Sequence, residues 1–393
     1  MKILSINAGS SSLKFTLYKM PEEEKIVTGQ FERIGIKDGS YKIKVNGEKI
    51  EKKHDLKDHK VAIDILLKEL LDLKIIKDLN EIKAIGHRVV QGADKYDDSV
   101  IITDEVVKNI EKFASLAPLH NPANLIGYQA VKEKLKDAKH VAIFDTAFHQ
   151  SIPKVKYTYP LPLEFLDLKV RKYGFHGTSH KYITEYMQKY LNKAKVNLII
   201  CHIGNGASIT AVKDSKSFDT SMGFTPVSGL MMGTRCGDID ISIAPYIMEE
   251  LNISIEEFMN ICNKKSGLLG ISEYSSDSRD IEEKVKEKDE KAILATDIYA
   301  DKVVSYIANY YFALEGKLDG IVFTAGIGEN SNTTRKRIID KLKCIDIYLD
   351  EKINDETRGS FGIISSTKSK YKVYVVPTDE EVEIARDTYR LTK

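Results

Sequence analysis

The pattern of apolar and polar residues at the start of the chain predicts a β-hairpin. Residues 2–6 form an apolar run typical of a strand, and the polar segment 7–12 (Asn-Ala-Gly-Ser-Ser-Ser) forms a tight turn. Over residues 13–18 apolar and polar side chains alternate, which is the period of a strand with one buried face. We therefore expect a hairpin whose tip is rich in Gly and Ser and whose second strand is half-buried.

The same pattern recurs in the second half of the chain. Residues 197–203 are apolar, residues 204–208 (Gly-Asn-Gly-Ala-Ser) form a turn, and residues 209–212 alternate imperfectly. Gly206 lies 197 residues after Gly9, close to half of the 393-residue chain. A repeat of this length predicts two related domains that each begin with a hairpin, with a loosely placed boundary near residues 146–152.

Helical and strand patterns alternate over the rest of the chain, which is typical of an α/β protein with mixed sheets. Two helix starts are marked by capping signals, Asn121-Pro122 and the capping box Ser254–Glu257. The other expected elements are strands at 83–85, 140–144, 320–324 and 371–376, and helices at 280–292, 297–314 and from 378 onward.

The composition excludes several classes of protein. The chain has 59 Lys and Arg against 58 Asp and Glu, so no global field attracts nucleic acid or an anionic membrane. The four cysteines are widely spaced and form no CxxC pair, which argues against a disulfide framework or a structural zinc site. No apolar run is long enough for a signal core or a membrane helix, so we expect a cytoplasmic protein.

Three glycine-containing turns follow predicted strands and are candidate phosphate sites: residues 7–12, 204–208 and 326–330. In such turns the backbone N–H groups point at phosphate oxygens because no side chain intervenes. One such turn usually does no more than reverse the chain, but three together favour phosphate binding. The GxxxxGK[ST], HExxH and GxSxG motifs are absent, and no GxGxxG follows a strand, which excludes the corresponding enzyme classes.

The local sequence sets His176 apart from the other histidines. It lies in Tyr-Gly-Phe-His-Gly (173–177), where small residues let a substrate approach closely. Four other histidines in unusual strings are more simply explained as structural or supporting residues: His87, His120, His149 and His180. A zinc site is the alternative, although the spacings match no common ligand pattern.

Two arginines and one carboxylate are further candidates. Arg88 follows the short strand predicted at 83–85, Arg235 lies in Gly-Thr-Arg-Cys-Gly-Asp (233–238), and Asp145 ends the strand at 140–144. A planar guanidinium binds carboxylate or phosphate through paired hydrogen bonds. A carboxylate at the end of a strand commonly points into the active site of an α/β protein, although a helix cap is the alternative for Asp145.

The string Thr-Asp-Glu-Glu (378–381) predicts the start of the last helix. Thr378 and Glu381 form a capping box, and an acidic first turn suits the helix dipole. This arrangement leaves Glu380 free to hold Mg²⁺ through water.

These strings resemble those of the acetate kinase family, in the family's order, from Ile3 to about Arg386. The matching strings are INAGSSSLKF, GHRVVQGA, APLHNPAN, FDTAFHQ, RKYGFHGTSH, HIGNGASIT, DTSMGFTP, GLMMGTRCGDID, FTAGIGENS and VVPTDEE. The resemblance implies a duplicated, actin-like (ribonuclease H-like) α/β fold with mixed sheets and an interdomain cleft. It places the domains at 1–148, with helix 382–393 packing back onto it, and 149–381.

The resemblance also implies reversible, Mg²⁺-dependent and direct in-line phosphoryl transfer from ATP to acetate, giving acetyl phosphate and ADP, with Mn²⁺ as a substitute metal. Arg88 and Arg235 would hold acetate and the phosphoryl group, His176 would stabilise the transition state, and Asp145 would orient the substrate. A base is not needed, since acetate is already a nucleophile at pH 7.

The resemblance assigns the binding residues as follows. Asn7 and Glu380 would bind the metal. Acetate would be bound by Arg88, Val90, Leu119, Phe175 and Pro226. The nucleotide would be bound by Ser10, Ser12, Lys14, His202, Gly204, Asn205, Gly206, Asp280, Gly326, Ile327, Gly328 and Asn330. A homodimer is implied by the resemblance alone.

The chain departs from the family's usual residues at Gln91 (usually His), Ala93 (Gly), Cys236 (Ser) and Asp379 (Asn). Cys236 places a thiol beside Arg235, whose charge we expect to lower the pKa of the thiol.

Two other functions stay open. A propionate kinase would differ by one methylene in its pocket, worth only about 1–3 kcal/mol. A nucleotide-driven binding protein of the actin or chaperone type would need a partner surface or an added domain, whereas the kinase-like strings extend over essentially the whole chain. A diphosphate-dependent enzyme is disfavoured, because the turn at 326–328 leaves room for a nucleoside.

Overall fold

The computed structural model describes residues 1–118 and 120–393, which divide into two compact units. Unit 1 comprises Met1–Gln150 and Asp379–Lys393, and unit 2 comprises Ser151–Thr378. Unit 1 therefore contains both ends of the chain. The domain division at 148/149 and 381/382 stays a prediction.

Unit 1 is built on a mixed eight-stranded sheet of order β5-β4-β3-β2-β1-β6-β8-β7. Its strands are β1 (Lys2–Ala8), β2 (Ser12–Lys19), β3 (Glu24–Glu32), β4 (Ser40–Val45), β5 (Glu48–Lys53), β6 (Ile82–Val89), β7 (Val100–Ile101) and β8 (Lys139–Phe144). Its helices are α1 (His59–Asp72), α2 (Asp104–Lys112), α3 (Asn121–Lys134) and α14 (Glu380–Thr392), with short 3₁₀ turns at Leu79–Glu81, Phe113–Leu116 and Ala147–Ser151.

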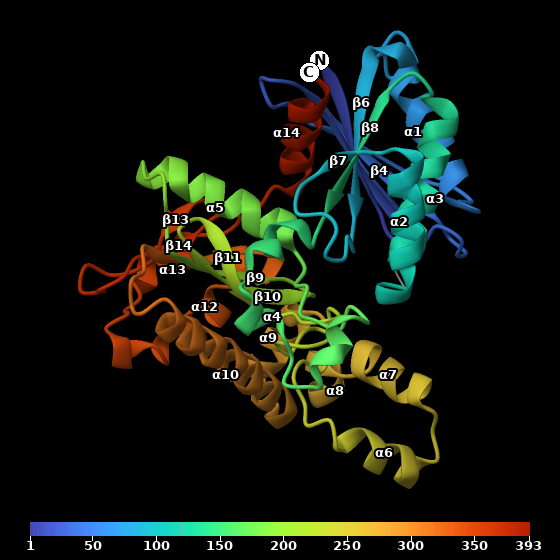
Figure 1. The fold of residues 1–393 in the computed structure, drawn as a ribbon. Helices are drawn as coiled ribbons and strands as arrows, with labels where there is room; N and C mark the ends of the chain where they lie inside the picture. Colours follow the sequence, from blue (N-terminus) through green and yellow to red (C-terminus); the bar gives the residue numbers. More distant parts are fainter. Residues whose placement is uncertain (119) are drawn as a thin grey trace. The chain divides into compact units, whose positions relative to one another are not determined.

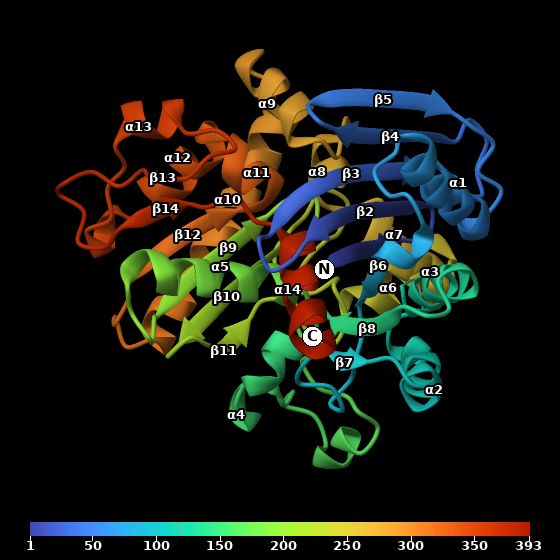
Figure 2. The ribbon, with the colours of Figure 1, turned by 90° about the horizontal axis from the view of Figure 1, so that it is seen from above.

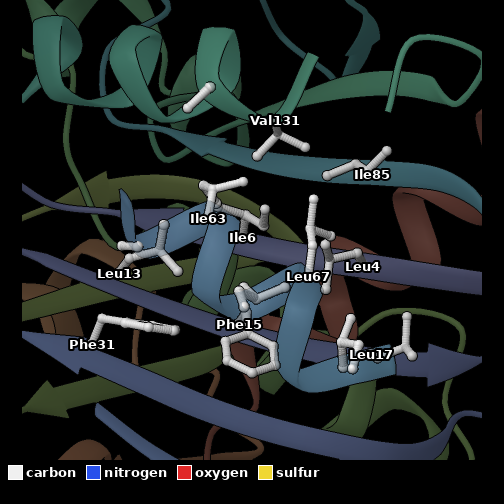
Figure 3. Close-up of a cluster of buried hydrophobic side chains, with 14 of the residues drawn as sticks. Leu4, Ile6, Leu13, Phe15, Leu17, Phe31, Ile63, Leu67, Ile85 and Val131 are labelled. Carbon is white, nitrogen blue, oxygen red and sulfur yellow. The ribbon is translucent and has the colours of Figure 1, made fainter. Parts of the chain in front are cut away.

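Helices cover both faces of this sheet, with α1 and α3 on one side and α14 on the other (Figure 1). The main core lies under α1 and α3, where Leu13, Phe15 and Leu17 of β2 pack against Ile63 and Leu67 (Figure 3). The expectation that β2 is half-buried is wrong, because Thr16 and Tyr18 on its other face are buried as well. Helix α14 contacts β2 there, and it comes from the far end of the chain.

Unit 2 is built on a mixed six-stranded sheet of order β11-β10-β9-β12-β14-β13. Its strands are β9 (Leu198–Ile203), β10 (Ala207–Lys213), β11 (Lys216–Thr220), β12 (Gly320–Thr324), β13 (Gly362–Ile363) and β14 (Val373–Val375). Its helices are α4 (Lys154–Tyr157), α5 (Gly177–Leu191), α6 (Ile243–Leu251), α7 (Ile255–Lys264), α8 (Gly267–Ser272), α9 (Ser278–Lys286), α10 (Glu290–Ala313), α11 (Ala325–Asn330), α12 (Asn332–Asp340) and α13 (Glu351–Glu356), with 3₁₀ turns at Leu163–Leu166 and Lys343–Ile345. Helix α5 packs on β9 from one side, and α10 packs on β9 and β10 from the other (Figures 1 and 2).

The two sheets repeat the same strand order. In unit 1 the order β3-β2-β1-β6-β8-β7 matches β11-β10-β9-β12-β14-β13 of unit 2. In each series the first three strands are antiparallel to their neighbours, the fourth and fifth run parallel to the third, and the last, at the edge, is antiparallel to the fifth. The hairpins predicted from the half-length repeat are β1–β2 and β9–β10, and both are present.

Several local predictions are wrong in instructive ways. The N-cap position of helix α3 is His120, which forms no side-chain capping hydrogen bond, rather than Asn121, whose side chain instead accepts a hydrogen bond from the Gln91 backbone N–H. The charged segment 280–292 is split between α9 and α10. The glycine-containing turn predicted at 326–330 is instead the short helix α11, which begins directly after the last residue of β12.

Candidate active site

Three neighbouring parallel strands of unit 1 bring polar side chains together at their carboxyl ends. These strands are β1, β6 and β8, and they carry Asn7, Arg88 and Asp145. Arg88 Nε donates to Asp145 Oδ1 (3.0 Å), its Nη2 donates to Asp145 Oδ2, and its Nη1 donates to Asn7 Oδ1 (3.1 Å). Arg88 lies inside β6 rather than after it, so the sheet itself fixes its backbone.

Electrostatic coupling in this cluster is strong because Asp145 is only 1% exposed. Burial alone would lower the pKa of Arg88, but Asp145, Glu380 and Glu381 together raise it above its ordinary value. The guanidinium is therefore a permanent cation held in one orientation by a bidentate carboxylate.

Glu380 begins α14 and lies within the field of this cluster. Burial raises the pKa of Glu380 to about 7; Asp145 and Glu381 act in the same direction, while Arg88 and Lys14 oppose them. The predicted capping box is wrong: Asp379 caps the helix by accepting from the Val382 N–H, and Thr378 Oγ1 instead lies 2.8 Å from Ser179 Oγ.

The donor set of unit 1 fits a magnesium ion. The Glu380 carboxylate accepts no hydrogen bond from the described residues, and burial raises its pKa to about 7, so a divalent cation bound beside it would favour its ionised form. Mg²⁺ typically takes one or two protein oxygens and completes its shell with water and phosphate oxygens. Glu380 and the amide oxygen of Asn7 are oxygen donors of this kind.

The tip of the first hairpin is tightly organised. Gly9 N–H donates to the Ser12 carbonyl (2.8 Å), and the Gly9 carbonyl lies 2.8 Å from His59 Nε2. Ser10 is exposed at this tip, and the Lys14 side chain is exposed on β2.

In unit 2, His176 stands at the start of α5 in a left-handed backbone conformation (φ 58°, ψ 22°). Its Nδ1 lies 3.0 Å from Ser208 Oγ, and its ring stacks on that of His202, with centroids 4.2 Å apart. A left-handed conformation is uncommon for a side-chain-bearing residue and is held only where the surroundings enforce it.

Arg235 lies in the loop between β11 and α6. Its Nη1 donates to the Pro226 carbonyl (3.3 Å), and burial lowers its pKa. Among the described residues it forms no salt bridge with a carboxylate, unlike Arg88. A half-buried guanidinium without a counter-charge is suited to an incoming anion.

Glycines bring Arg235 and His176 to one place. A Cβ on Gly206 would lie 3.5 Å from Arg235 Nη1 and 3.6 Å from His176 Nε2, so both side chains face the space beside this glycine. The Arg235 loop is tied to the same hairpin tip, because Gly233 N–H donates to the Asn205 carbonyl (2.9 Å) and a Cβ on Gly233 would overlap the Asn205 side chain.

A cavity of about 880 Å³ opens beside this tip within unit 2. It is large enough for a nucleotide. Five of the predicted nucleotide residues line it: Gly204, Asn205, Gly326, Ile327 and Asn330.

Four other predicted nucleotide residues do not line the cavity. Gly206 lies beside it, and His202 and Gly328 are buried. Asp280 accepts a hydrogen bond from Ser275 Oγ (2.6 Å).

The sequence analysis missed ten residues of the cavity wall: Ser276, Asp277, Ser278, Arg279, Glu282, Lys286, Ser331, Asn332, Thr333 and Arg358. Two of these, Glu282 and Lys286, belong to the segment 280–292, which is rich in Lys and Glu and was predicted as a helix. Charged side chains occur on cavity walls as well as on faces open to solvent, so a charged pattern does not distinguish the two. In this region only the nearby string Gly-Ile-Gly (326–328) indicated a binding site.

The residues predicted for the acetate pocket fall in different places. Val90 is buried in unit 1, where its N–H donates to Asn124 Oδ1 (3.0 Å). Phe175 is buried and Pro226 half-buried in unit 2. Leu119 lies outside the described residues.

The expected activation of Cys236 is wrong. Burial, together with the adjacent thiol of Cys262, raises the pKa of Cys236 to about 12. Arg235 is next in sequence, but its charge does not overcome the loss of solvation. All four cysteines are free thiols.

The histidines predicted to be structural are largely internal. His87, His149 and His180 are buried, and His87 Nε2 lies 2.9 Å from His140 Nδ1. Within residues 1–118 and 120–393 no three His, Cys, Asp or Glu side chains are grouped as metal ligands, so the zinc alternative finds no support. In the same residues no helix combines the length and apolar character needed to cross a membrane.

Residues 2–386 match the acetokinase family. The chain belongs to the acetokinase family. It is 52% identical to the acetate kinase of Bacillus subtilis over 395 residues, which covers 100% of both chains. The match confirms the family inferred from the sequence strings.

Solved structures agree with this family assignment. The chain superposes on the acetate kinase of Porphyromonas gingivalis with a TM-score of 0.93, 43% identity and full coverage of both chains. It superposes on a propionate kinase from Francisella tularensis with a TM-score of 0.95 and 41% identity, covering 99% of each. A structure named an acetate kinase and one named a propionate kinase therefore both share this fold.

Proposed function

We propose that this acetokinase-family chain is an acetate kinase (EC 2.7.2.1), which transfers the terminal phosphoryl group of ATP to acetate. The observation that carries the mechanism is the contrast between two guanidinium groups. Arg88 is held by Asp145, whereas Arg235 has no carboxylate partner among the described residues and faces the same space as His176 Nε2.

Each group has a distinct part in the proposed reaction. Arg88 binds the acetate carboxylate in a fixed orientation, and Asp145 orients Arg88 rather than taking a proton. Arg235 and His176 Nε2–H hold the equatorial oxygens of the phosphoryl group during in-line transfer. Phosphoryl transfer needs mainly positioning and charge stabilisation, and these charged and hydrogen-bonding side chains are of the kind that supplies both.

The nucleotide is proposed to lie in the cavity lined by Gly204, Asn205, Gly326 and Ile327. The hairpin tip with Ser10, Ser12 and Lys14 is proposed to bind phosphate oxygens, with Asp280, Gly206, Gly328 and His202 in supporting positions. Mg²⁺, or Mn²⁺ in its place, would be held by Asn7 and Glu380 and would neutralise charge on the β- and γ-phosphates.

The test is an assay of acyl phosphate formation. With acetate, ATP and Mg²⁺, hydroxylamine should trap an acyl phosphate in equal amount to the ADP formed. ADP release that does not depend on acetate would instead support a nucleotide-driven binding protein.

Propionate is the second candidate substrate, since a closely similar structure is named a propionate kinase. Comparing kcat/KM for acetate, propionate and butyrate decides between them. We expect acetate to have the highest value, and a preference for butyrate would refute the assignment.

A homodimer is the proposed assembly, on the basis of the family resemblance. Apolar side chains around α6 support it, because Ile241, Tyr246 and Leu251 are 85%, 63% and 59% exposed. Apolar side chains exposed close together in sequence are candidates for a protein interface. Sedimentation of the chain and of an Ile241→Lys variant would show a dimer for the first and a weaker one for the second.

A further inference from the structure

Two histidines of unit 2 share one serine hydroxyl. Ser208 Oγ lies 3.0 Å from His176 Nδ1 and 2.8 Å from His180 Nε2. Ser208 and His180 are both fully buried, so water does not replace these contacts. The fold brings them together because Ser208 lies opposite His202 in the β9–β10 pair, and α5, which carries His180, packs on β9.

The shared hydroxyl couples the proton positions of the two rings. A hydroxyl carries one proton, so Ser208 can donate to only one ring nitrogen and must accept from the other if both hydrogen bonds form. If it donates to His176 Nδ1, then His180 donates from Nε2–H, and a neutral His176 carries its own proton on Nε2. The reverse arrangement leaves Nε2 of a neutral His176 as a bare lone pair.

The surroundings of His176 Nε2 decide between these arrangements. This nitrogen and Arg235 Nη1 face the same space beside Gly206. A bare lone pair there would repel phosphoryl oxygens, whereas an N–H would donate to them. A second full positive charge on His176 is disfavoured by the neighbouring guanidinium.

We infer that Ser208 and His180 are positioning residues that hold His176 as the neutral tautomer with its proton on Nε2, through a chain from His180 Nε2–H to Ser208 Oγ–H to His176 Nδ1. The stacked His202 ring keeps the plane of His176 fixed while this chain sets its proton. The inference rests on the role proposed above for His176. It deepens that role, because without it the Nε2 of a neutral imidazole can present either an N–H or a bare lone pair to the phosphoryl group.

The tautomer is measurable in the unaltered chain. In protein labelled with ¹⁵N-histidine, with the His176 signals assigned by their loss in His176→Asn, the ring should show a protonated Nε2 and an unprotonated Nδ1. A protonated Nδ1 with an unprotonated Nε2 would overturn the inference, and so would a doubly protonated ring at pH 7.5.

Kinetics test whether this chain of hydrogen bonds affects turnover. Ser208→Ala should lower kcat by about 10–100-fold and change KM for acetate and ATP by less than about twofold, because only transition-state contacts are lost. The matched control is Thr210→Val on the same face of β10, whose buried hydroxyl contacts Thr220 and no histidine. It should keep near-normal kcat. Equal kcat in Ser208→Ala and Thr210→Val would overturn the inference.

A second pair of variants gives the same answer if Ser208→Ala folds poorly. His180→Gln keeps an N–H donor near the place of Nε2 and should retain most of the kcat, whereas His180→Leu removes the donor and should lose about as much as Ser208→Ala. Equal losses of kcat in both His180 variants would overturn the proposed hydrogen-bond chain.

His176→Ala separates this inference from the proposed function. Near-normal turnover in His176→Ala contradicts the role proposed for His176 itself. A large loss in His176→Ala, together with normal turnover in Ser208→Ala and His180→Leu, contradicts only the proton chain.

Discussion

Arg88 and Arg235 carry the same charge but contribute differently to stability. Arg88 forms a bidentate pair with the buried Asp145, whereas within the described part of the chain the Arg235 guanidinium contacts the Pro226 carbonyl and the Met232 sulfur and no carboxylate. Removing one partner of a buried pair leaves an uncompensated charge, and removing an unpaired guanidinium does not.

We therefore predict that Arg235→Ala lowers kcat by about 100–1,000-fold while the free energy of unfolding stays within about 1 kcal/mol of the parent. Arg88→Ala should lower kcat by orders of magnitude as well, but also destabilise the fold by about 3–5 kcal/mol, because the buried Asp145 loses the guanidinium that pairs with it. Urea unfolding and steady-state kinetics of both variants test this. Equal stability of the two variants would contradict the pairing of Arg88.

The buried pair His87 and His140 predicts sensitivity to acid. Burial lowers the pKa of His87 well below 6.5, with His140 adding to the shift, and burial also lowers the pKa of His140. Below pH 6.5 the unfolded chain binds protons that folded His87 does not, so stability falls as the pH falls, by up to about 1.4 kcal/mol per pH unit from this residue.

Urea unfolding at pH 7.5 and 5.5 measures this slope. His87→Gln should make the slope shallower. The control is His54→Gln, the same substitution at an exposed position, and the slope of His87→Gln is compared with it. An unchanged slope in His87→Gln would contradict the prediction.

At the scale of single elements, the end of helix α1 holds a residue whose type does not suit its backbone conformation. Helix α1 ends in two hydrogen bonds, Lys74 N–H to Leu71 O (2.9 Å) and Ile75 N–H to Leu70 O (3.0 Å), with Lys74 at φ 56°. This is the Schellman arrangement, in which the left-handed position favours glycine because other residues carry a Cβ.

We predict that Lys74→Gly raises the free energy of unfolding by about 0.5–1 kcal/mol. The same change at Lys68, which is exposed in the middle of α1, should lower it by about the same amount. Thermal unfolding of the two variants should therefore shift in opposite directions, and a shared direction would contradict the assignment of this helix end.

At the scale of the whole molecule, one unit depends on the last segment of the chain. Helix α14 packs on β1, β2, β6 and β8, and Ser5 Oγ donates to the Glu381 carbonyl (2.9 Å) across 376 positions. The approach is close enough that a Cβ on Gly86 would overlap Thr388 and Ile384 of α14.

Gly86→Ala should therefore destabilise unit 1 by about 1–3 kcal/mol, since α14 must move to make room. Gly326→Ala is the matched change, because its Cβ would meet no atom within 4 Å. It should keep the stability of the parent but raise KM for ATP, since Gly326 lines the cavity proposed to bind the nucleotide. Urea unfolding compares the two, and equal stability would contradict the close packing of α14.

Much of the candidate site was predictable because its residues lie in strings that are distinctive in themselves. Arg88, Asp145, His176 and Arg235 were all chosen from local sequence. The structure groups the first two in one cluster and the last two in another. The cavity wall at 276–279, and Glu282 and Lys286, were missed because polar side chains that face a cavity resemble those that face solvent.

The sequence by itself determined the two repeated hairpins, several of the central strands and the family, since these depend on short-range periodicity and on contiguous strings. Only the tertiary structure decided that β2 is buried on both faces, that Asp145 is paired with Arg88, and that Ser208 joins two histidines. These facts depend on contacts between segments up to hundreds of residues apart, and a local pattern carries no information about which distant side chain completes a hydrogen bond or covers a face.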